Sequence, residues 1–159
     1  MLSIKLVTVG TLKEAYLRDA FEEYKKRLGA FCKFSFVELK ECKIPDKPSE
    51  QEIAKALDEE GKAILSQISL RSYVVALCIE GQTFSSEEFA NQIEKYSLRT
   101  NEVAFVIGSA YGLSDKVKKI AHEQLSLSRM TFSHQLARIL FMEVLYRSFS
   151  IINGQKYHK

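Results

Sequence analysis

The sequence predicts an α/β fold in which a mostly parallel sheet is flanked by helices. Short runs of β-branched and aliphatic residues alternate along the chain with longer segments whose apolar residues recur at helical spacing. Two of the short runs, 73–79 (YVVALCI) and 103–107 (VAFVI), are apolar throughout, which is typical of central strands buried on both faces. No linker, repeat or low-complexity segment interrupts the chain, so a single domain spanning 1–159 is expected.

Two predicted strands and the helix between them occupy the start of the chain. Residues 3–9 (SIKLVTV) are rich in β-branched and aliphatic residues and are followed by a glycine, which favours a strand. Residues 15–28 carry apolar side chains at helical spacing, and Gly29 is expected to end this helix in the C′ position. Phe34 and Phe36 alternate with polar residues, so a second strand is expected there.

A polar loop at 40–50 (KECKIPDKPSE) contains both prolines of the chain and leads into a second helix. Ser49 precedes Glu52 by three residues, the spacing of a capping box. The paired acids Glu59 and Glu60 are expected on the surface of this helix. Three of its apolar residues share one side: Ile53, Leu57 and Ile64.

The second half of the chain continues the alternation of strands and helices. Ser85 or Ser86 can cap a short helix before the strand at 103–107. A helix is expected at 115–124, and the short apolar run 125–127 follows it.

The last predicted helix, 133–152, ends at Asn153 and Gly154 and is apolar nearly all round. Such a helix must be buried nearly all round. One side can face the sheet, and a symmetric homodimer would supply a partner for the other. Deep burial within a single chain is the alternative.

The composition excludes several classes of protein. Cys32, Cys42 and Cys78 are an odd number of cysteines without a CxxC pair, which argues against a disulfide framework and against a metal site. No apolar run approaches the roughly 18 residues that span a bilayer, and the start of the chain lacks the features of a signal peptide. A soluble, cytoplasmic protein that does not enter a membrane is expected.

Basic residues gather in two places. Lys25, Lys26 and Arg27 are adjacent, and the C-terminal tail contains Lys156 and Lys159. The net charge is +3 and the pI about 8.7, short of the basic extreme that marks a nucleic-acid-binding domain by charge alone. These clusters are therefore either a solvated face or an RNA contact.

A glycine loop, FVIGSAYGLSD, follows the apolar run at 103–107 and places Gly108 and Gly112 before the next helix. Ligands of open α/β sheets bind at the carboxyl ends of strands, so the location suits a site. The G-x-x-x-G spacing matches neither the dinucleotide fingerprint nor the P-loop, which argues against NAD and ATP. By itself the loop is either a turn with two glycines or a ligand site.

The three histidines form no recognised catalytic motif. His122 is expected to be exposed in a polar helical segment, His134 opens the last helix, and His158 is the penultimate residue. The chain has no Gly-x-Ser-x-Gly elbow and no HExxH motif, so a hydrolase is not indicated.

Four segments in order resemble the small SPOUT-class methyltransferases that modify N3 of a pseudouridine in helix 69 of large-subunit (23S) ribosomal RNA. The segments are VTVGTLKEAYLRDAFEEYKKRL, VIGSAYGL, LSLSRMTFSHQLAR and YRSFSIINGQKYHK. The chain departs from the family pattern at Ser109, where a second glycine is usual, and at Ser133, where proline is usual. Serine is a good helix N-cap, so Ser133 can replace proline at the start of the last helix.

The resemblance implies a C-terminal trefoil knot, a homodimer, and S-adenosylmethionine bound in the knot by loops that follow three strands. Carried over onto this sequence, the cofactor-binding residues are Leu77, Gly108, Leu127, Ser128, Arg129, Met130, Thr131 and Phe132. The polar run before the last helix would then be the cofactor loop, and the apolar helix would form the dimer.

The resemblance also implies a methyl transfer for which the N3 proton must be lost. We expect Tyr157 and His158 to reach the target base, at the cofactor pocket of the partner chain; a frayed terminus is the alternative. Arg138 lies one helical turn after His134, and together they could hold a phosphate or the base; a structural salt bridge is the alternative for Arg138.

The implied partner is the ribosome and its 23S rRNA. The expected RNA contacts are Lys25, Lys26, Arg27, Arg129, Arg147, Lys156 and Lys159. With so modest a charge and no additional RNA-binding domain, recognition of an assembled ribosomal surface is expected. Two other functions remain open: a SPOUT methyltransferase with another RNA target, and a dimeric ribosome-binding factor without catalytic activity.

Overall fold

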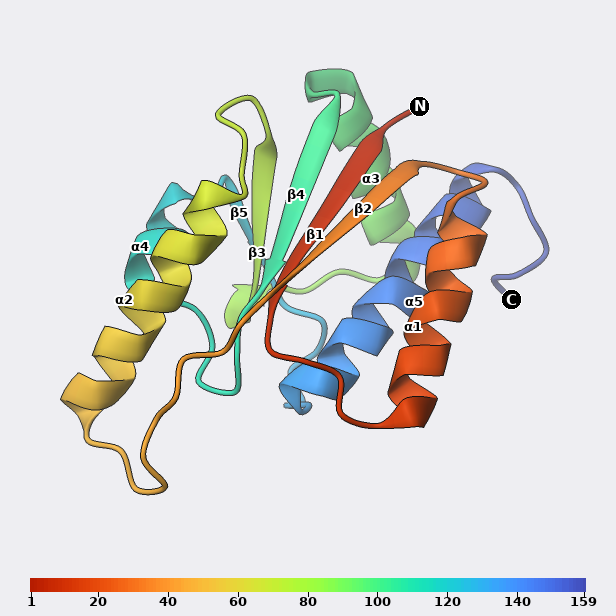
Figure 1. Cartoon of the computed structure of the whole chain (residues 1–159). Coiled ribbons are helices and arrows are strands. Elements are labelled where there is room, and N and C mark those ends of the chain that lie inside the picture. Colours follow the sequence, from red (N-terminus) through yellow and green to blue (C-terminus); the bar gives the residue numbers. More distant parts are fainter.

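Five parallel strands form one sheet in the order β2-β1-β4-β3-β5 in the computed structural model, which describes all residues 1–159 (Figure 1). Every strand pairing is parallel, which confirms the predicted sheet. In chain order the elements are β1 (Ser3–Val9), α1 (Ala15–Leu28), β2 (Lys33–Leu39), α2 (Glu50–Ser66), β3 (Tyr73–Gln82), α3 (Ser86–Arg99), β4 (Glu102–Ile107), α4 (Asp115–Ile120), β5 (Glu123–Leu125) and α5 (His134–Ile152).

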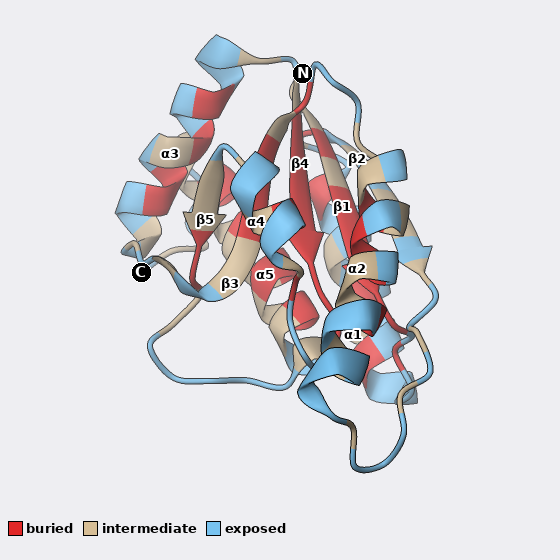
Figure 2. Ribbon diagram, turned by 90° about the vertical axis from the view of Figure 1, so that its left-hand side faces the viewer, coloured by how far each residue is buried: buried red, intermediate tan, exposed pale blue.

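The helices form a layer on each face of the sheet, with α1, α3 and α5 on one face and α2 and α4 on the other (Figure 1). Neighbouring strand residues point to opposite faces, so Leu6 and Phe105 pack with the first helix layer while Val7 and Val106 pack with the second. The central strands β1 and β4 are buried on both faces (Figure 2), as their apolar sequences predict.

The last helix, α5, is covered largely by its own chain. It lies on the sheet between α1 and α3, and eight of its 19 residues are buried. The alternative of burial within one chain therefore accounts for much of its apolar surface. The side that faces away from the sheet remains half-buried or exposed along one stripe, which we call the outer stripe: Leu136, Leu140, Glu143, Val144, Arg147 and Ile151.

Two capping boxes begin helices where the sequence suggests. Ser49 accepts a hydrogen bond from the backbone of Glu52 and donates its own backbone amide to the Glu52 side chain, as predicted. Ser85 and Glu88 form the same arrangement at α3, so Ser85 rather than Ser86 is the cap.

The helix predicted at 115–124 is wrong in its second half. The helix α4 ends at Ile120, and the chain then turns into β5, which pairs with β3. His122 makes this change of direction: its backbone amide donates to the Val74 carbonyl at 2.8 Å, and its Nδ1 accepts from the Val74 amide at 2.9 Å. His122 is exposed, as expected, but it does not belong to a helix. Pairing with a neighbouring strand outweighs local helix propensity here.

Two boundaries also differ from the expectation. Gly29 is the C-cap of α1 with φ −58°, a right-handed conformation, rather than a left-handed glycine in the C′ position. The strand β3 continues past residue 79 to Gln82, because an irregularity in its pairing with β5 lets the chain rejoin that strand at Leu125. The trefoil knot implied by the resemblance stays a prediction for this chain.

An ion pair between a buried arginine and a partly exposed glutamate fastens α5 to the edge of the sheet. The side chain of Arg138 is 1% exposed; its NH1 contacts Glu38 Oε2 of β2 at 2.7 Å, and its NH2 donates to the carbonyl of Gly10 at 2.9 Å. Burial lowers the pKa of Arg138, and the Glu38 carboxylate opposes that effect. Removing one partner of such a pair leaves a charge in the interior without compensation.

We expect the Glu38→Gln variant to lose about 1.5–2 kcal/mol of unfolding free energy, because it leaves the buried Arg138 charge without its carboxylate, although water screens that partly exposed carboxylate. The control is Glu23→Gln, which removes a surface pair with Arg27 and should cost less than about 0.5 kcal/mol. Urea unfolding of both variants measures the difference. Equal losses would show that Arg138 does not need its partner.

Candidate functional site

A cavity of about 290 Å³ opens where three strands end beside the start of α5. Leu77 of β3 is paired in register with Ile107 of β4 on one side and with Leu125 of β5 on the other. All three residues line the cavity. The carboxyl ends of neighbouring parallel strands are where open α/β sheets bind their ligands, so the topology favours a site here.

The glycine loop after β4 forms one wall of the cavity. A Cβ atom at Gly108 would lie 2.1 Å from the carbonyl oxygen of Gly112, so only glycine fits at this position. Gly112 itself has φ +87°, and its amide donates to the Ser109 carbonyl at 2.9 Å. The two glycines therefore make a tight turn, and that turn brings its backbone to the cavity.

Ser109, the first departure from the family pattern, ties this loop to α2. Its hydroxyl donates to Glu60 Oε1 at 2.9 Å, and Glu60 Oε2 accepts from the backbone amide of Cys42 at 3.0 Å. Glu60 is only 4% exposed, so its predicted place on the helix surface is wrong. A single sequence gives no signal for this contact, because the three residues come from separate parts of the chain.

The loop between β5 and α5 forms the opposite wall. The Ser126 hydroxyl donates to the Ser128 carbonyl at 2.9 Å, and the Ser128 hydroxyl accepts from the Met130 amide at 3.0 Å. Ser133 caps α5 by accepting from the Leu136 amide at 3.3 Å, as expected for its replacement of proline. The serines of this polar run thus fix the shape of the loop that faces the cavity.

Seven of the eight residues implied for the cofactor line this one cavity: Leu77, Gly108, Leu127, Ser128, Met130, Thr131 and Phe132. Arg129 is exposed and does not line it. The structure therefore brings together residues from three separate parts of the sequence. Their role in binding stays a prediction.

The charged groups at the cavity are paired with each other. Lys118 Nζ lies 2.6 Å from Glu80 Oε1, and this contact raises the pKa of Lys118 and lowers that of Glu80. Burial raises the pKa of the neighbouring Cys78 thiol, which favours its neutral form. The remaining lining is mostly hydrophobic, with Met130 and Tyr111 74% and 46% exposed at its edge.

Arg138 does not face the cavity. Its guanidinium is held by Glu38 and the Gly10 carbonyl, and it is absent from the cavity lining. The structure therefore favours the salt-bridge alternative over a direct contact of Arg138 with phosphate or base. His134, one turn earlier, does line the cavity.

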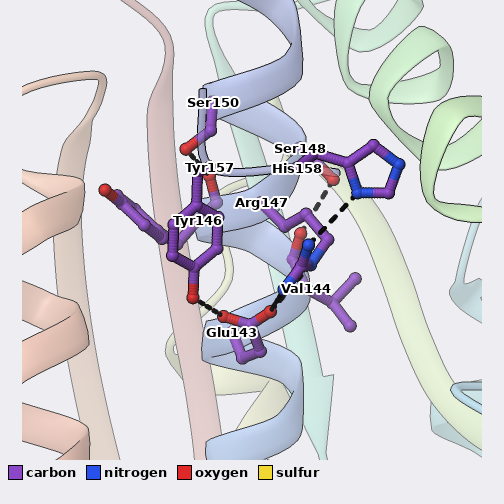
Figure 3. A network of polar contacts seen from close by, with 8 residues as sticks. All are labelled: Glu143, Val144, Tyr146, Arg147, Ser148, Ser150, Tyr157 and His158. Carbon is purple, nitrogen blue, oxygen red and sulfur yellow. Dashed lines mark hydrogen bonds and ion pairs between the residues drawn. The ribbon is translucent and has the colours of Figure 1, made fainter. Parts of the chain in front are cut away.

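The C-terminal tail folds back onto the outer stripe of α5 (Figure 3). The Tyr157 hydroxyl donates to Glu143 Oε2 at 2.7 Å, and this bond raises the pKa of Tyr157. His158 Nδ1 lies 3.1 Å from Arg147 NH1, and its Nε2 lies 2.8 Å from Glu87 Oε1 of α3. The tail is thus docked rather than frayed, but it does not line the cavity of its own chain.

The expected RNA-contacting residues lie on several surfaces. Lys25, Lys26 and Arg27 are exposed in the last turn of α1, and Lys156 and Lys159 are exposed in the tail. Arg147 differs from them because it is half-buried and paired with Glu143 at 2.6 Å.

Neither a metal centre nor a membrane span is evident. No group of three or more His, Cys, Asp or Glu side chains is arranged to hold a metal ion. None of the helices has both the length and the hydropathy needed to cross a bilayer.

Comparison with known proteins bears on the fold and the family. A solved structure of "a probable methylase family protein" from Haemophilus influenzae Rd KW20 superposes on 98% of this chain and 70% of its own, with a TM-score of 0.54. The two chains are 18% identical, so this likeness concerns the fold alone.

Sequence comparison identifies the family as well as the fold. Proteins named Ribosomal RNA large subunit methyltransferase H from Streptococcus thermophilus (strain ATCC BAA-491 / LMD-9) and Streptococcus pneumoniae (strain CGSP14) are each 48% identical over 159 residues, covering 99% of this chain and 100% of the relative. The family model described as "Predicted SPOUT methyltransferase" matches residues 2–158. The chain therefore belongs to the SPOUT methyltransferase family.

Proposed function

We propose that this chain uses S-adenosylmethionine to methylate N3 of a pseudouridine in helix 69 of 23S rRNA, pseudouridine 1915 in the usual numbering. The substrate would be the assembled ribosome, and the site of action therefore the cytoplasm. Support comes from the streptococcal relatives, whose names specify a large-subunit ribosomal RNA methyltransferase, and from the match of their full length to this chain. One domain spanning 1–159 would carry the whole activity.

The observation that carries the proposal is the single cavity at the in-register ends of β3, β4 and β5. Its lining suits a nucleoside cofactor, because it is mostly hydrophobic and its charged pair, Lys118 and Glu80, is internally balanced. The absence of a Cβ atom at Gly108 lets the Gly112 carbonyl pack against it, and the tight turn that results brings loop backbone to the cavity. When bound there, S-adenosylmethionine would supply an electrophilic methyl group on a sulfonium sulfur, so the reaction requires no metal.

The seven lining residues carried over from the family would hold the cofactor. Backbone groups of Gly108 and of the loop at 126–133 would supply hydrogen bonds, while Leu77, Leu127 and Phe132 would supply apolar contact. Arg129, exposed and outside the cavity, is better suited to phosphate contact than to the cofactor.

We further propose that the functional unit is a homodimer formed through the outer stripe of α5. The sheet, α1 and α3 cover the other sides of this helix and the tail covers Glu143 and Arg147, so the rest of the stripe is the surface left for a second copy. In a two-fold arrangement the same stripe meets itself. If the helices cross antiparallel near residue 142, Arg147 of one chain lies opposite Ala137 of the other, where the partner cavity begins.

This arrangement would bring the tail of one chain to the cavity of its partner. Along one α5 helix, Arg147 and Ala137 are separated by roughly 15 Å at 1.5 Å per residue, too far for the tail to serve its own cavity from its docked position. Tyr157 would there exchange its hydrogen bond to Glu143 for one to a base carbonyl, because a phenol has a single O–H to donate. RNA phosphates would meet the exposed basic residues of α1 and the tail.

The function is tested with ribosomes from a strain that lacks helix 69 methylation. These are incubated with the purified protein and methyl-labelled S-adenosylmethionine, and the labelled nucleoside is identified by mass spectrometry. Label in N3-methylpseudouridine is the expected result. Label in another nucleoside would show that the enzyme methylates a different RNA position. Ribosome binding without cofactor and without label would favour the non-catalytic binding factor.

Replacing Gly108 with alanine should lower the affinity for S-adenosylmethionine by at least about tenfold, or 1.4 kcal/mol, because the added Cβ atom must displace the Gly112 carbonyl from the cavity wall. Isothermal titration calorimetry measures the affinity, with circular dichroism to establish folding. Gly29→Ala is the matched control, since Gly29 has an ordinary right-handed conformation at the far end of α1. Unchanged affinity in a folded Gly108→Ala protein would place the cofactor elsewhere.

Deleting residues 157–159 should abolish turnover on ribosomes while leaving cofactor affinity within about twofold, because the tail does not line the cavity of its own chain. Deleting Lys159 alone separates the loss of one basic RNA contact from the loss of Tyr157 and His158, because it keeps the bonds of those two residues to α5 and α3. Full activity of the longer deletion would rule out a role of the tail in the reaction.

A further inference from the structure

The proposed reaction needs a group that accepts a proton, and the inference below rests on that proposed function. N3 of pseudouridine carries a hydrogen, and its electron pair becomes available to a methyl group only as the N–H bond breaks. The family resemblance does not identify the acceptor. Candidates are the titratable groups that line the cavity or that the tail could bring to it.

The tail offers poor acceptors in its docked form. Tyr157 stays protonated because its hydroxyl donates to Glu143. An arginine only donates hydrogen bonds, so the contact with Arg147 NH1 makes His158 Nδ1 the acceptor. The proton of neutral His158 then lies on Nε2, where it is donated to Glu87. A further proton would have to enter at Nδ1, beside the charge of Arg147.

The cavity itself offers one uncommitted nitrogen base. Lys118 is protonated and paired with Glu80, whose carboxylate is in turn occupied by the lysine. His134 also lines the cavity and is half-buried at the first position of α5. Hydrogen bonds around it engage Ser133, Gln135 and Arg138, and leave its two ring nitrogens without a partner in the chain.

The His134 ring lies beside Gly10. A Cβ atom at Gly10 would lie 3.6 Å from His134 Nε2 and 3.5 Å from Glu41 Oε2, so the imidazole and the carboxylate flank this glycine. Gly10 is held on both sides, because its amide donates to the Leu39 carbonyl and its carbonyl accepts from Arg138 NH2. The buried arginine therefore holds the backbone that the His134 ring borders.

We infer that His134 is the proton acceptor of the methyl transfer. As the methyl group moves from the sulfonium sulfur to N3, the N3–H bond breaks and its proton passes to an imidazole nitrogen of His134. The electron pair of that bond remains on N3, where it supports the new N–CH₃ bond, and the pair of the breaking S–CH₃ bond stays on sulfur. The imidazolium then returns its proton to water.

The charges near the ring are consistent with this role. Glu41 is the acid that flanks Gly10, and it is exposed to water. Arg138 lies one turn further along α5, but its charge is matched by Glu38. Lys118 and Glu80, at the same cavity, are matched with each other. The carboxylate near His134 that has no such partner is therefore that of Glu41.

The test compares His134→Gln with wild type in single-turnover methylation of ribosomes that lack helix 69 methylation, at saturating cofactor. We expect the rate to fall by about 10²–10⁴-fold, the usual contribution of a general base, while calorimetry finds cofactor affinity within about twofold of wild type. His134→Asn is a second variant that suits the start of a helix. His122→Gln makes the same change at an exposed histidine outside the cavity and is the matched control; because His122 Nδ1 accepts from the Val74 amide, circular dichroism of every variant establishes folding.

The pH dependence distinguishes an acceptor from a structural residue. Without His134, hydroxide must remove the N3 proton, so the rate of the variant should rise about tenfold per pH unit and approach that of wild type in alkali. A deficit of equal size at every pH, a loss explained by weaker cofactor binding, or a wild-type rate in either variant would overturn the inference. If wild type itself transfers no methyl group to these ribosomes, the proposed function fails instead.

Discussion

The burial of α5 is the constraint on which the other features depend. This helix is apolar on most of its circumference, so it must be covered on most sides, and the sheet, α1 and α3 provide that cover. Its start is held by the ion pair between the buried Arg138 and Glu38 and by the Ser133 cap. Because that start lies beside the carboxyl ends of β3, β4 and β5, the packing of α5 into the core also places the α5 side of the cavity.

The two ends of α5 carry different parts of the proposed chemistry. At the first end His134 and Ala137 meet the cavity, and further along the helix Glu143 and Arg147 hold the tail. These two regions lie on one rigid element, so their separation is fixed. A site that needs both must therefore draw them from two chains, which gives a physical reason for the proposed dimer beyond the apolar surface, much of which its own chain covers.

Much of the fold could be predicted from the sequence, because local signals and final structure agree. Continuous apolar runs predicted the buried strands, and Ser49 with Glu52 predicted a helix start that the structure confirms. The predictions fail where contacts between residues far apart in the sequence determine the structure. His122 bonds to Val74 where a helix was predicted to continue, and Glu60 is buried and accepts a hydrogen bond from Ser109. The cavity residues came from the family resemblance, since no spacing within one segment reveals which strand ends are neighbours.

The central claim, that each active site combines the cavity of one chain with the tail of the other, is tested most directly with mixed dimers. One protomer carries Gly108→Ala and the other lacks residues 157–159; two affinity tags isolate the heterodimer, which is assayed on ribosomes that lack helix 69 methylation. At a cofactor concentration between the dissociation constants of the wild-type and the Gly108→Ala sites, the Gly108→Ala homodimer should methylate slowly and the tail-deleted homodimer not at all. The heterodimer contains one site with an intact cavity and an intact tail and should methylate faster than either. A heterodimer no faster than the two homodimers, while a tagged wild-type dimer methylates, would contradict the account.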